Sequence, residues 1–198
     1  MRANKYEVIV FGTSAGGLRV IRSLVMSLPA NFSMALIIIQ HLSDASPGSW
    51  IDLLERDCKV LIKEADEKEV IQSGIVYVAP PNYHLLIERD RTFTLTVDER
   101  VNYARPAIDV TFISAAEAYG EHLIGVVATG ANFDGAEGLK QIKEMGGMTI
   151  VQDPKGAEVE AMPRAAIALA KPDRILTMEG IIKYLLEVHS VNLADGNP

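Results

Sequence analysis

Apolar residues along the chain occur in two patterns that alternate from one end to the other. Seven short runs are almost continuously apolar, as is typical of strands in a parallel sheet covered on both faces; they lie at 6–12, 34–40, 59–65, 74–81, 121–130, 148–153 and 174–178. In the stretches between them, apolar residues recur every three or four positions, which predicts helices. These stretches lie at 17–28, 46–57, 106–120, 134–147, 162–170 and 180–190.

The first two helical stretches also carry end signals. One face of the stretch 17–28 is formed by Leu18, Ile21, Leu24, Val25 and Leu28. Pro29 ends this helix, because proline removes a backbone donor and clashes with the preceding turn. In the second stretch, Ser46 is the expected N-cap and Pro47 occupies the favoured first helical position.

The segment 84–98 has a different pattern, in which two alternating runs flank the polar turn 89–91. This pattern predicts an antiparallel hairpin. The alternation of strands and helices elsewhere predicts an α/β fold: a doubly wound, largely parallel sheet with helices on both faces, to which the hairpin adds at one edge. We expect one domain over residues 1–190, a frayed polar tail at 191–198 and no additional receiver domain.

Composition narrows the classes of function. Apolar residues make up 48% and charged residues 23% of the 198 positions, as in an ordinary globular protein. The net charge of −7 disfavours nucleic acid and anionic lipid as partners. No apolar run reaches the length of a membrane span and no signal peptide precedes the first strand, so we expect a cytoplasmic protein. The single cysteine, Cys58, fits a reducing compartment.

Three predicted strands end in residues that together suggest a catalytic site. Ser14 follows the first strand within Gly12-Thr-Ser-Ala-Gly16, His41 follows the second, and Asp134 follows the strand near 121–130. In open α/β sheets, ligands bind beyond the carboxyl ends of the strands. We therefore expect these three side chains at one edge of the sheet.

These residue types suit nucleophilic hydrolysis. A serine hydroxyl needs an imidazole to take its proton, and the imidazole needs a carboxylate to fix its tautomer and stabilise its charged form. The pattern G-x-S-x-G around Ser14 matches a nucleophile elbow, in which small neighbours permit a sharp turn from strand to helix. Ser14, His41 and Asp134 are thus predicted as nucleophile, base and orienting carboxylate.

Each residue taken alone has an alternative explanation. Ser14 also fits a helix N-cap, and Asp134 fits a capping box with Glu137 three residues later. His41 also fits a hydrogen-bonded loop histidine. The shared position at strand ends favours the joint interpretation.

Other ligand classes find less support. A dinucleotide fingerprint would require glycine in place of Ser14 and an acidic residue after the second strand, where Gln40 and His41 stand. No Gly-Lys-Ser/Thr follows the glycines, which excludes a P-loop. The four histidines lack metal-ligand spacing. We therefore expect no dinucleotide, no P-loop nucleotide and no metal.

Several segments resemble, in order, the catalytic domain of the chemotaxis protein-glutamate methylesterases, the CheB-type family. They are VIVFGTSAGGL, IIIQHLSD, GIVYVAPPNYHLLI, YARPAIDVTFISAAEAYG, GVVATGANFDGAEGL, GGMTIVQDPKGAE and AMPRAAI, and together they span about residues 6–187. The resemblance implies a cofactor-independent esterase that removes methyl groups from glutamate esters on the cytoplasmic helices of chemoreceptors, with glutamine deamidation as a related activity. It also implies that Ser14, His41 and Asp134 form the triad.

The sequence departs from this family in two ways. Ala131 and Asn132 stand where the family commonly has methionine and glycine, which bears on substrate preference. The family's usual receiver domain is not found before the first strand. An inactive signalling or anion-binding module of the same fold is the alternative function, in which the helix near Gly17 would hold an anion.

Further residues are candidates for substrate contact. His84 and Arg105 lie in the shared segments, although a loop histidine and a surface arginine explain them equally well. Because the chain is acidic, a locally basic cleft would help an acidic receptor helix to approach. The candidates for this local charge are Arg19, Arg22, Arg105 and Arg164.

Overall fold

The apolar runs form seven parallel strands of one sheet. A computed structural model describes residues 6–41 and 49–195. The strands are β1 (Val8–Thr13), β2 (Ala35–Gln40), β3 (Leu61–Glu64), β4 (Ile75–Val78), β7 (Leu123–Val127), β8 (Met148–Gln152) and β9 (Arg174–Leu176), in the order β3-β4-β2-β1-β7-β8-β9. All six pairings in this sheet are parallel, so the predicted parallel sheet is confirmed.

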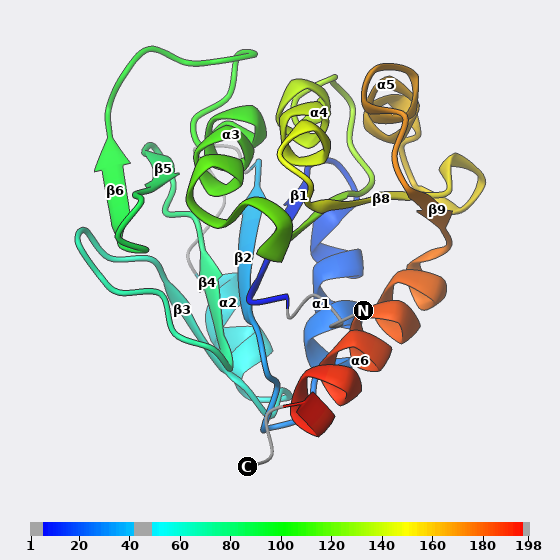
Figure 1. Cartoon of the computed structure of the whole chain (residues 1–198). Helices are drawn as coiled ribbons and strands as arrows, with labels where there is room; N and C mark the ends of the chain where they lie inside the picture. The colour runs from blue at the N-terminus through cyan, green and yellow to red at the C-terminus, as the bar shows by residue number, and fades with distance from the viewer. Residues whose placement is uncertain (1–5, 42–48, 196–198) are drawn as a thin grey trace.

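Helices cover both faces of the sheet (Figure 1). One face carries α1 (Gly17–Ser27), α2 (Ser49–Glu55) and α6 (Met178–Asp195). The other carries α3 (Ile108–Tyr119), α4 (Ala136–Glu144) and α5 (Ala161–Ala170), and two short 3₁₀ turns lie at Gly120–His122 and Pro154–Gly156. The doubly wound arrangement predicted from the sequence is confirmed. The predicted helix-start residues Ser46 and Pro47 lie outside the described residues.

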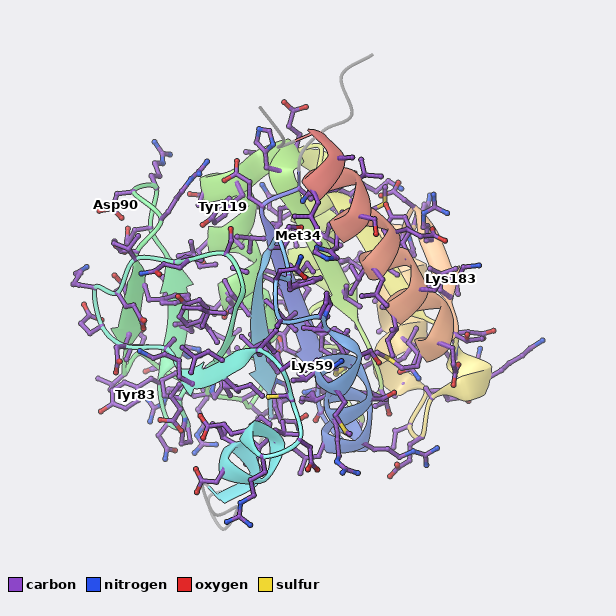
Figure 2. The ribbon with its side chains drawn as sticks, turned by 90° about the horizontal axis from the view of Figure 1, so that it is seen from below. Met34, Lys59, Tyr83, Asp90, Tyr119 and Lys183 are labelled. Carbon is purple, nitrogen blue, oxygen red and sulfur yellow. The ribbon has the colours of Figure 1, made fainter. Side chains whose placement is uncertain are left out.

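Strand side chains alternate between two hydrophobic cores, as the period of two in a strand requires. In β1, Val8 and Val10 join the core beneath α3, α4 and α5, whereas Ile9 and Phe11 join the core beneath α1, α2 and α6. Figure 2 shows α1 and α6 lying over this second face. Burial on both faces explains why the strands are continuously apolar.

The predicted hairpin is present as a separate two-stranded sheet of β5 (His84–Ile87) and β6 (Phe93–Thr96). It packs against α3, where Thr111 Oγ1 donates to the Leu85 carbonyl (2.7 Å) and the Ile87 N–H donates to Ser114 Oγ (3.0 Å). An isolated bridge joins Val70 to Thr92. The hairpin is therefore held by α3 and by the segment after β3.

The tail prediction is wrong for residues 191–195. Helix α6 continues through Asp195, and Asn192 is buried with its Nδ2 donating to the Tyr6 carbonyl (2.6 Å). The polar composition of this stretch suggested fraying, but an asparagine that satisfies a backbone carbonyl fixes the helix against the start of the chain. Residues 196–198 lie outside the described part.

The two glycines of the G-x-S-x-G pattern serve different purposes. A Cβ on Gly12 would lie 2.5 Å from Ile108 Cγ2, so this glycine allows α3 to approach β1 closely. Gly16 has φ +77°, in the left-handed region that favours glycine, and it is the N-cap residue of α1. The motif thus combines a packing requirement with a turn requirement.

We expect Gly12→Ala to lower the free energy of unfolding by about 1–3 kcal/mol, because the added methyl group overpacks the contact with Ile108. The measurement is urea denaturation at neutral pH. Gly156→Ala is the matched control: a Cβ there meets nothing within 4 Å, so its effect should stay within about 0.5 kcal/mol. Equal losses in both variants would contradict the packing explanation.

Candidate active site

Strand register brings the three predicted site residues to one edge of the sheet. Thr13 of β1 pairs with Gln40 of β2, so Ser14 and His41 leave the sheet at the same level. Gly12 of β1 pairs with Val127 of β7, the strand that leads to Asp134. After these strands the chain turns to opposite faces, because α1 and α4 cover different sides. This divergence marks the position where open α/β sheets bind ligands.

Backbone hydrogen bonds hold the Ser14 loop against the end of β7. The N–H of Ser14 and Oγ1 of Thr13 both donate to the carbonyl of Thr129, at 3.0 and 2.8 Å. The carbonyl of Ser14 accepts from the N–H of Gly17 (2.9 Å). Helix α1 has Gly16 as its N-cap and no side-chain capping bond, so Ser14 is not its cap. The Ser14 hydroxyl is therefore not used for capping.

Gln40 connects the Ser14 and His41 segments, a role that no sequence pattern predicts. Its Nε2 donates to the carbonyl of Ser14 (2.9 Å) and to the carbonyl of His41 (2.7 Å). The side chain is buried, and its Oε1 has no partner in the part of the chain that the structure describes. One buried amide thus fixes the spacing of the two backbones.

His41 and Asp134 are in direct contact, with 2.8 Å between His41 Nε2 and Asp134 Oδ2. The histidine side chain is 12% exposed and the carboxylate is fully buried. Because a carboxylate accepts, the Nε2 of a neutral ring carries the hydrogen, and Nδ1 is left as the acceptor. The pair therefore presents one basic nitrogen that is not used by the carboxylate.

Asp134 is also bound by the amino-terminal end of α3. Its Oδ2 accepts from the N–H of Ile108 (2.6 Å), and its Oδ1 accepts from the N–H groups of Asp109 and Gly135, both at 3.1 Å. Asn102 adds a bond from Nδ2 to Oδ1 (2.9 Å). Burial opposes ionisation of Asp134, but the hydrogen bonds from His41, Asn102 and the backbone hold its pKa below the usual value.

The capping-box alternative for Asp134 does not describe this geometry. The N-cap of α4 is Gly135, with no side-chain capping bond, whereas the carboxylate reaches across to the start of α3. Asn132 supports the local turn, since its Oδ1 accepts from the N–H of Asp134 (3.1 Å).

A second buried carboxylate, Asp109, lies beside the first. Its Oδ1 accepts from the N–H of Gly138 (2.7 Å), and its Oδ2 accepts from Nδ2 of Asn102 (2.8 Å). Burial, together with the charge of Asp134, raises the pKa of Asp109 to about 6. Neither Asp109 nor Asn102 was selected from the sequence, because their contacts depend on how the segment after β6 and the start of α3 meet the start of α4.

Two backbone donors remain near the serine. Within the described residues, the N–H groups of Ala15 and Gly16 donate no hydrogen bond. They lie between Ser14 and the start of α1, where the helix dipole favours negative charge. This segment is suited to stabilise an anionic oxygen.

The structure assigns His84 and Arg105 to loop support. His84 is buried, with Nε2 donating to the carbonyl of Glu99 (3.0 Å) and Nδ1 accepting from the N–H of Ala107 (3.3 Å). Arg105 donates from Nη1 to the carbonyls of Val97 (2.7 Å) and Asp98 (2.8 Å). Both hold the segment between β6 and α3.

The other proposed arginines lie on helix surfaces. Arg19 is exposed on α1, and Arg22 forms an ion pair with Asp57 (3.0 Å). Arg164 forms an ion pair with Glu160 (2.9 Å). These two ion pairs reduce the positive charge that Arg22 and Arg164 present.

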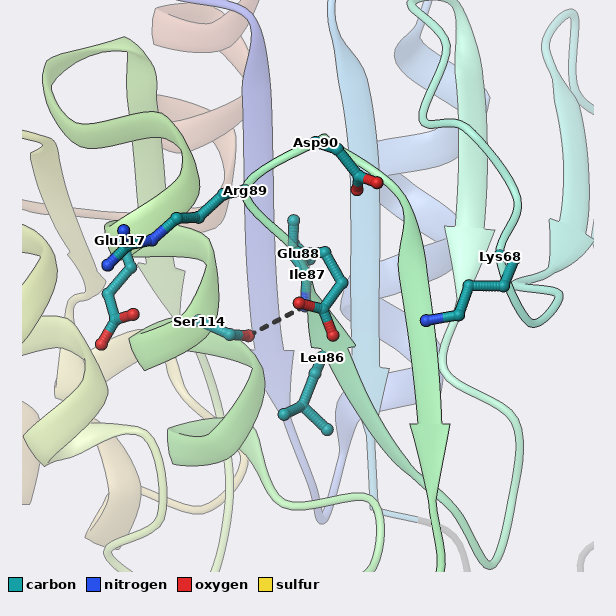
Figure 3. A pocket seen from close by; sticks show the side chains of 8 residues that line it. All are labelled: Lys68, Leu86, Ile87, Glu88, Arg89, Asp90, Ser114 and Glu117. Atoms are coloured by element: carbon teal, nitrogen blue, oxygen red, sulfur yellow. Dashed lines mark hydrogen bonds between the residues drawn. The ribbon is translucent and has the colours of Figure 1, made fainter.

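A pocket of about 580 Å³ lies away from these residues, between the hairpin turn and α3 (Figure 3). Charged side chains of both signs line it, including Lys68, Glu88 and Glu117. None of the three predicted site residues contributes to its lining. Over residues 6–41 and 49–195, no group of three or more His, Cys, Asp and Glu side chains is arranged to hold a metal ion, and no helix is long and apolar enough to cross a membrane.

The raised pKa of Asp109 predicts a pH dependence of stability. Its ordinary value is 3.8, so between about pH 4 and 6 the folded protein holds this proton more tightly than the unfolded chain does. The free energy of unfolding should therefore fall as the pH rises through this window, relative to Asp109→Asn. Asp134, with a lowered pKa, loses its stabilising contribution only as the pH falls below about 4.

Denaturation of both proteins in urea at several pH values measures this difference. Shared groups that do not interact with Asp109 cancel in the comparison, and Asp134, with its lowered pKa, stays ionised in this window. A wild-type curve that runs parallel to that of the Asp109→Asn variant between pH 4 and 6 would contradict the assignment.

Comparisons with known proteins identify the family of this chain. The family model described as CheB methylesterase matches residues 9–185. A Leptospira interrogans protein with the provisional name protein-glutamate methylesterase/protein-glutamine glutaminase is 51% identical over 188 residues, covering 95% of this chain and 97% of that protein. The Thermotoga maritima CheB methylesterase catalytic domain has 31% identity and a TM-score of 0.87, covering 92% of this chain and 98% of that structure.

Relatives differ in length. A protein-glutamate methylesterase/protein-glutamine glutaminase of Pseudomonas syringae pv. tomato is 34% identical over 183 residues, which cover 92% of this chain and 47% of that protein. The chain thus spans nearly all of the Leptospira relative and about half of the Pseudomonas relative. The extent of the family match and these identities show that the chain belongs to the CheB methylesterase family.

Proposed function

We propose that this chain is a serine esterase that hydrolyses glutamate methyl esters on the cytoplasmic helices of chemoreceptors and also deamidates glutamine there. Ser14, His41 and Asp134 form its catalytic triad. The observation that carries the proposal is the bond between His41 Nε2 and the buried Asp134 carboxylate (2.8 Å), at the sheet edge where Ser14 also lies. The names of the relatives support the substrate class.

Catalysis proceeds as two acyl transfers. Nδ1 of His41 takes the proton of the Ser14 hydroxyl as Oγ bonds to the ester carbonyl carbon, and the imidazolium returns that proton to the departing methoxide, which leaves as methanol. In the second half, His41 takes a proton from water, the hydroxide attacks the acyl-serine, and Ser14 regains a proton as the glutamate side chain leaves. Asp134 holds the ring and stabilises its positive form.

In each half of the reaction, the anionic oxygen of the tetrahedral intermediate needs hydrogen-bond donors. The N–H groups of Ala15 and Gly16 and the start of α1 are our candidates for this oxyanion hole. With ammonia in place of methanol as leaving group, the same steps deamidate glutamine. The nucleophile, the base and the oxyanion donors all come from the chain, so the mechanism requires no cofactor.

Substrate preference depends partly on the loop before Asp134. Asn132 stands where the family commonly has glycine, and its side chain bonds to the Asp134 backbone. Ala131, in place of the common methionine, leaves a smaller side chain beside Gly130. We propose that these two residues adjust which receptor segment the enzyme accepts. We also propose that the chain forms a single catalytic domain and acts in the cytoplasm.

Ser14→Ala and His41→Ala should each lower the kcat for ester hydrolysis by at least about a thousandfold, because neither the nucleophile nor its activation can be replaced. Asp134→Ala should retain more activity than either. Hydrolysis of a methylated receptor fragment and thermal melts provide the measurements. Ser23→Ala, an exposed serine on α1, is the control and should keep wild-type activity.

Labelling with a serine-directed phosphonate distinguishes the enzyme from an inactive module of the same fold. We expect one label on Ser14 in the wild type and none in Ser14→Ala. An unlabelled wild type, or full turnover in a folded Ser14→Ala variant, would refute the triad.

Turnover should fall at acidic pH, since only the neutral ring of His41 accepts the proton of the Ser14 hydroxyl. Asp134 stays ionised near neutral pH because its pKa lies below the usual value. A chelator should leave the rate unchanged. A flat rate from pH 5 to 8, or loss of activity with chelator, would argue against this mechanism.

A further inference from the structure

A tight turn in the segment between β6 and α3 contacts the predicted catalytic carboxylate. Val101 and Ala104 exchange backbone hydrogen bonds of 3.2 and 2.9 Å, and the two residues between them, Asn102 and Tyr103, both have positive φ (52° and 65°). Two consecutive positive φ values define a type I′ turn, in which asparagine is favoured at the first central position. We call Val101–Ala104 the rim turn.

The rim turn has an inner and an outer side chain. Nδ2 of Asn102 donates inward to Oδ1 of Asp134 (2.9 Å) and to Oδ2 of Asp109 (2.8 Å), so one amide group bridges two buried carboxylates. Tyr103 lies outward and is 92% exposed. The base of the same segment is held by His84 and Arg105 through bonds to backbone carbonyls.

A second exposed aromatic ring flanks the bond between Asn102 and Asp134. Phe133 directly precedes Asp134 and is 56% exposed, while Tyr103 directly follows Asn102. Each partner of this hydrogen bond thus has an exposed aromatic neighbour in the chain. Large exposed aromatic side chains are typical centres of protein contacts, because they bury much area at low entropic cost.

Through the bond between Asn102 and Asp134, a protein that contacts Tyr103 and Phe133 would bind next to the predicted catalytic carboxylate. We propose that the rim turn is a recognition element for the protein substrate: Tyr103 and Phe133 contact the helix that carries the ester, and Asn102 is a positioning residue for Asp134. This inference rests on the proposed esterase function. Asn102 bonds to Asp134, so their chain neighbours Tyr103 and Phe133 lie beside the sheet edge that carries the predicted triad, where the ester must bind.

Tyr103→Ala tests the outer contact. Two substrates are compared: a methylated chemoreceptor cytoplasmic fragment and N-acetylglutamate γ-methyl ester. The ratio of kcat/KM for the fragment to kcat/KM for the small ester should fall about tenfold, through a higher KM for the fragment. Leu61→Ala, 56% exposed on edge strand β3, is the control and should leave the ratio unchanged.

Asn102→Gly tests the inner contact, since glycine keeps the positive φ and removes only the amide. We expect kcat to fall about tenfold or more for both substrates with KM little changed, because the orientation of His41 depends on Asp134. Asn82→Gly is the control: Asn82 is exposed, also has positive φ (66°), and lies outside the site.

The outcomes separate this inference from the proposed function. Suppose the wild type hydrolyses the small ester through Ser14. The recognition role is then wrong if Tyr103→Ala leaves the ratio of the two kcat/KM values unchanged, or if the wild type does not hydrolyse the fragment. An unchanged kcat in Asn102→Gly refutes the positioning role. If the wild type hydrolyses neither substrate, the proposed function fails, and this inference fails with it.

Discussion

The candidate site depends on one buried carboxylate that is kept ionised mainly by hydrogen bonds. Asp134 has no exposure to solvent, and burial alone would favour its neutral form. The start of α3 supplies two backbone donors, and Asn102 and His41 supply two more. A carboxylate fixed in this way can orient an imidazole without first reorganising, which is the condition for electrostatic preorganisation.

The need to bring these hydrogen-bond donors to Asp134 also explains how closely the elements pack around the site. Helix α3 reaches Asp134 only because Gly12 of β1 has no side chain to keep Ile108 away. On the opposite side of the serine loop, the buried amide nitrogen of Gln40 joins two backbones, and its oxygen has no partner among residues 6–41 and 49–195. This one amide sets the spacing of the Ser14 and His41 backbones.

The sequence predicted the strands and the helices, because burial on both faces of the strands and helical periodicity are local signals. It also predicted that Ser14, His41 and Asp134 lie at one edge of the sheet, whereas their catalytic roles stay a prediction. It missed Asn102, Asp109 and Gln40. Asn102 and Asp134 are 32 positions apart, and their contact depends on how the segment after β6 folds over the sheet edge. The tail at 191–195 was misjudged because one asparagine that satisfies a distant carbonyl outweighed the polar composition of its neighbours.

The bond between Asn192 and the Tyr6 carbonyl also affects how the protein can be joined to others. Helix α6 starts just after β9, at the carboxyl edge of the sheet, and its 18 residues cover about 27 Å on the way back to the opposite edge. Tyr6 precedes β1 at that same opposite edge. A tag, surface anchor or fused domain joined next to Tyr6 or Asp195 would therefore start at the sheet edge opposite Ser14, and only a linker of comparable length would let it reach Ser14.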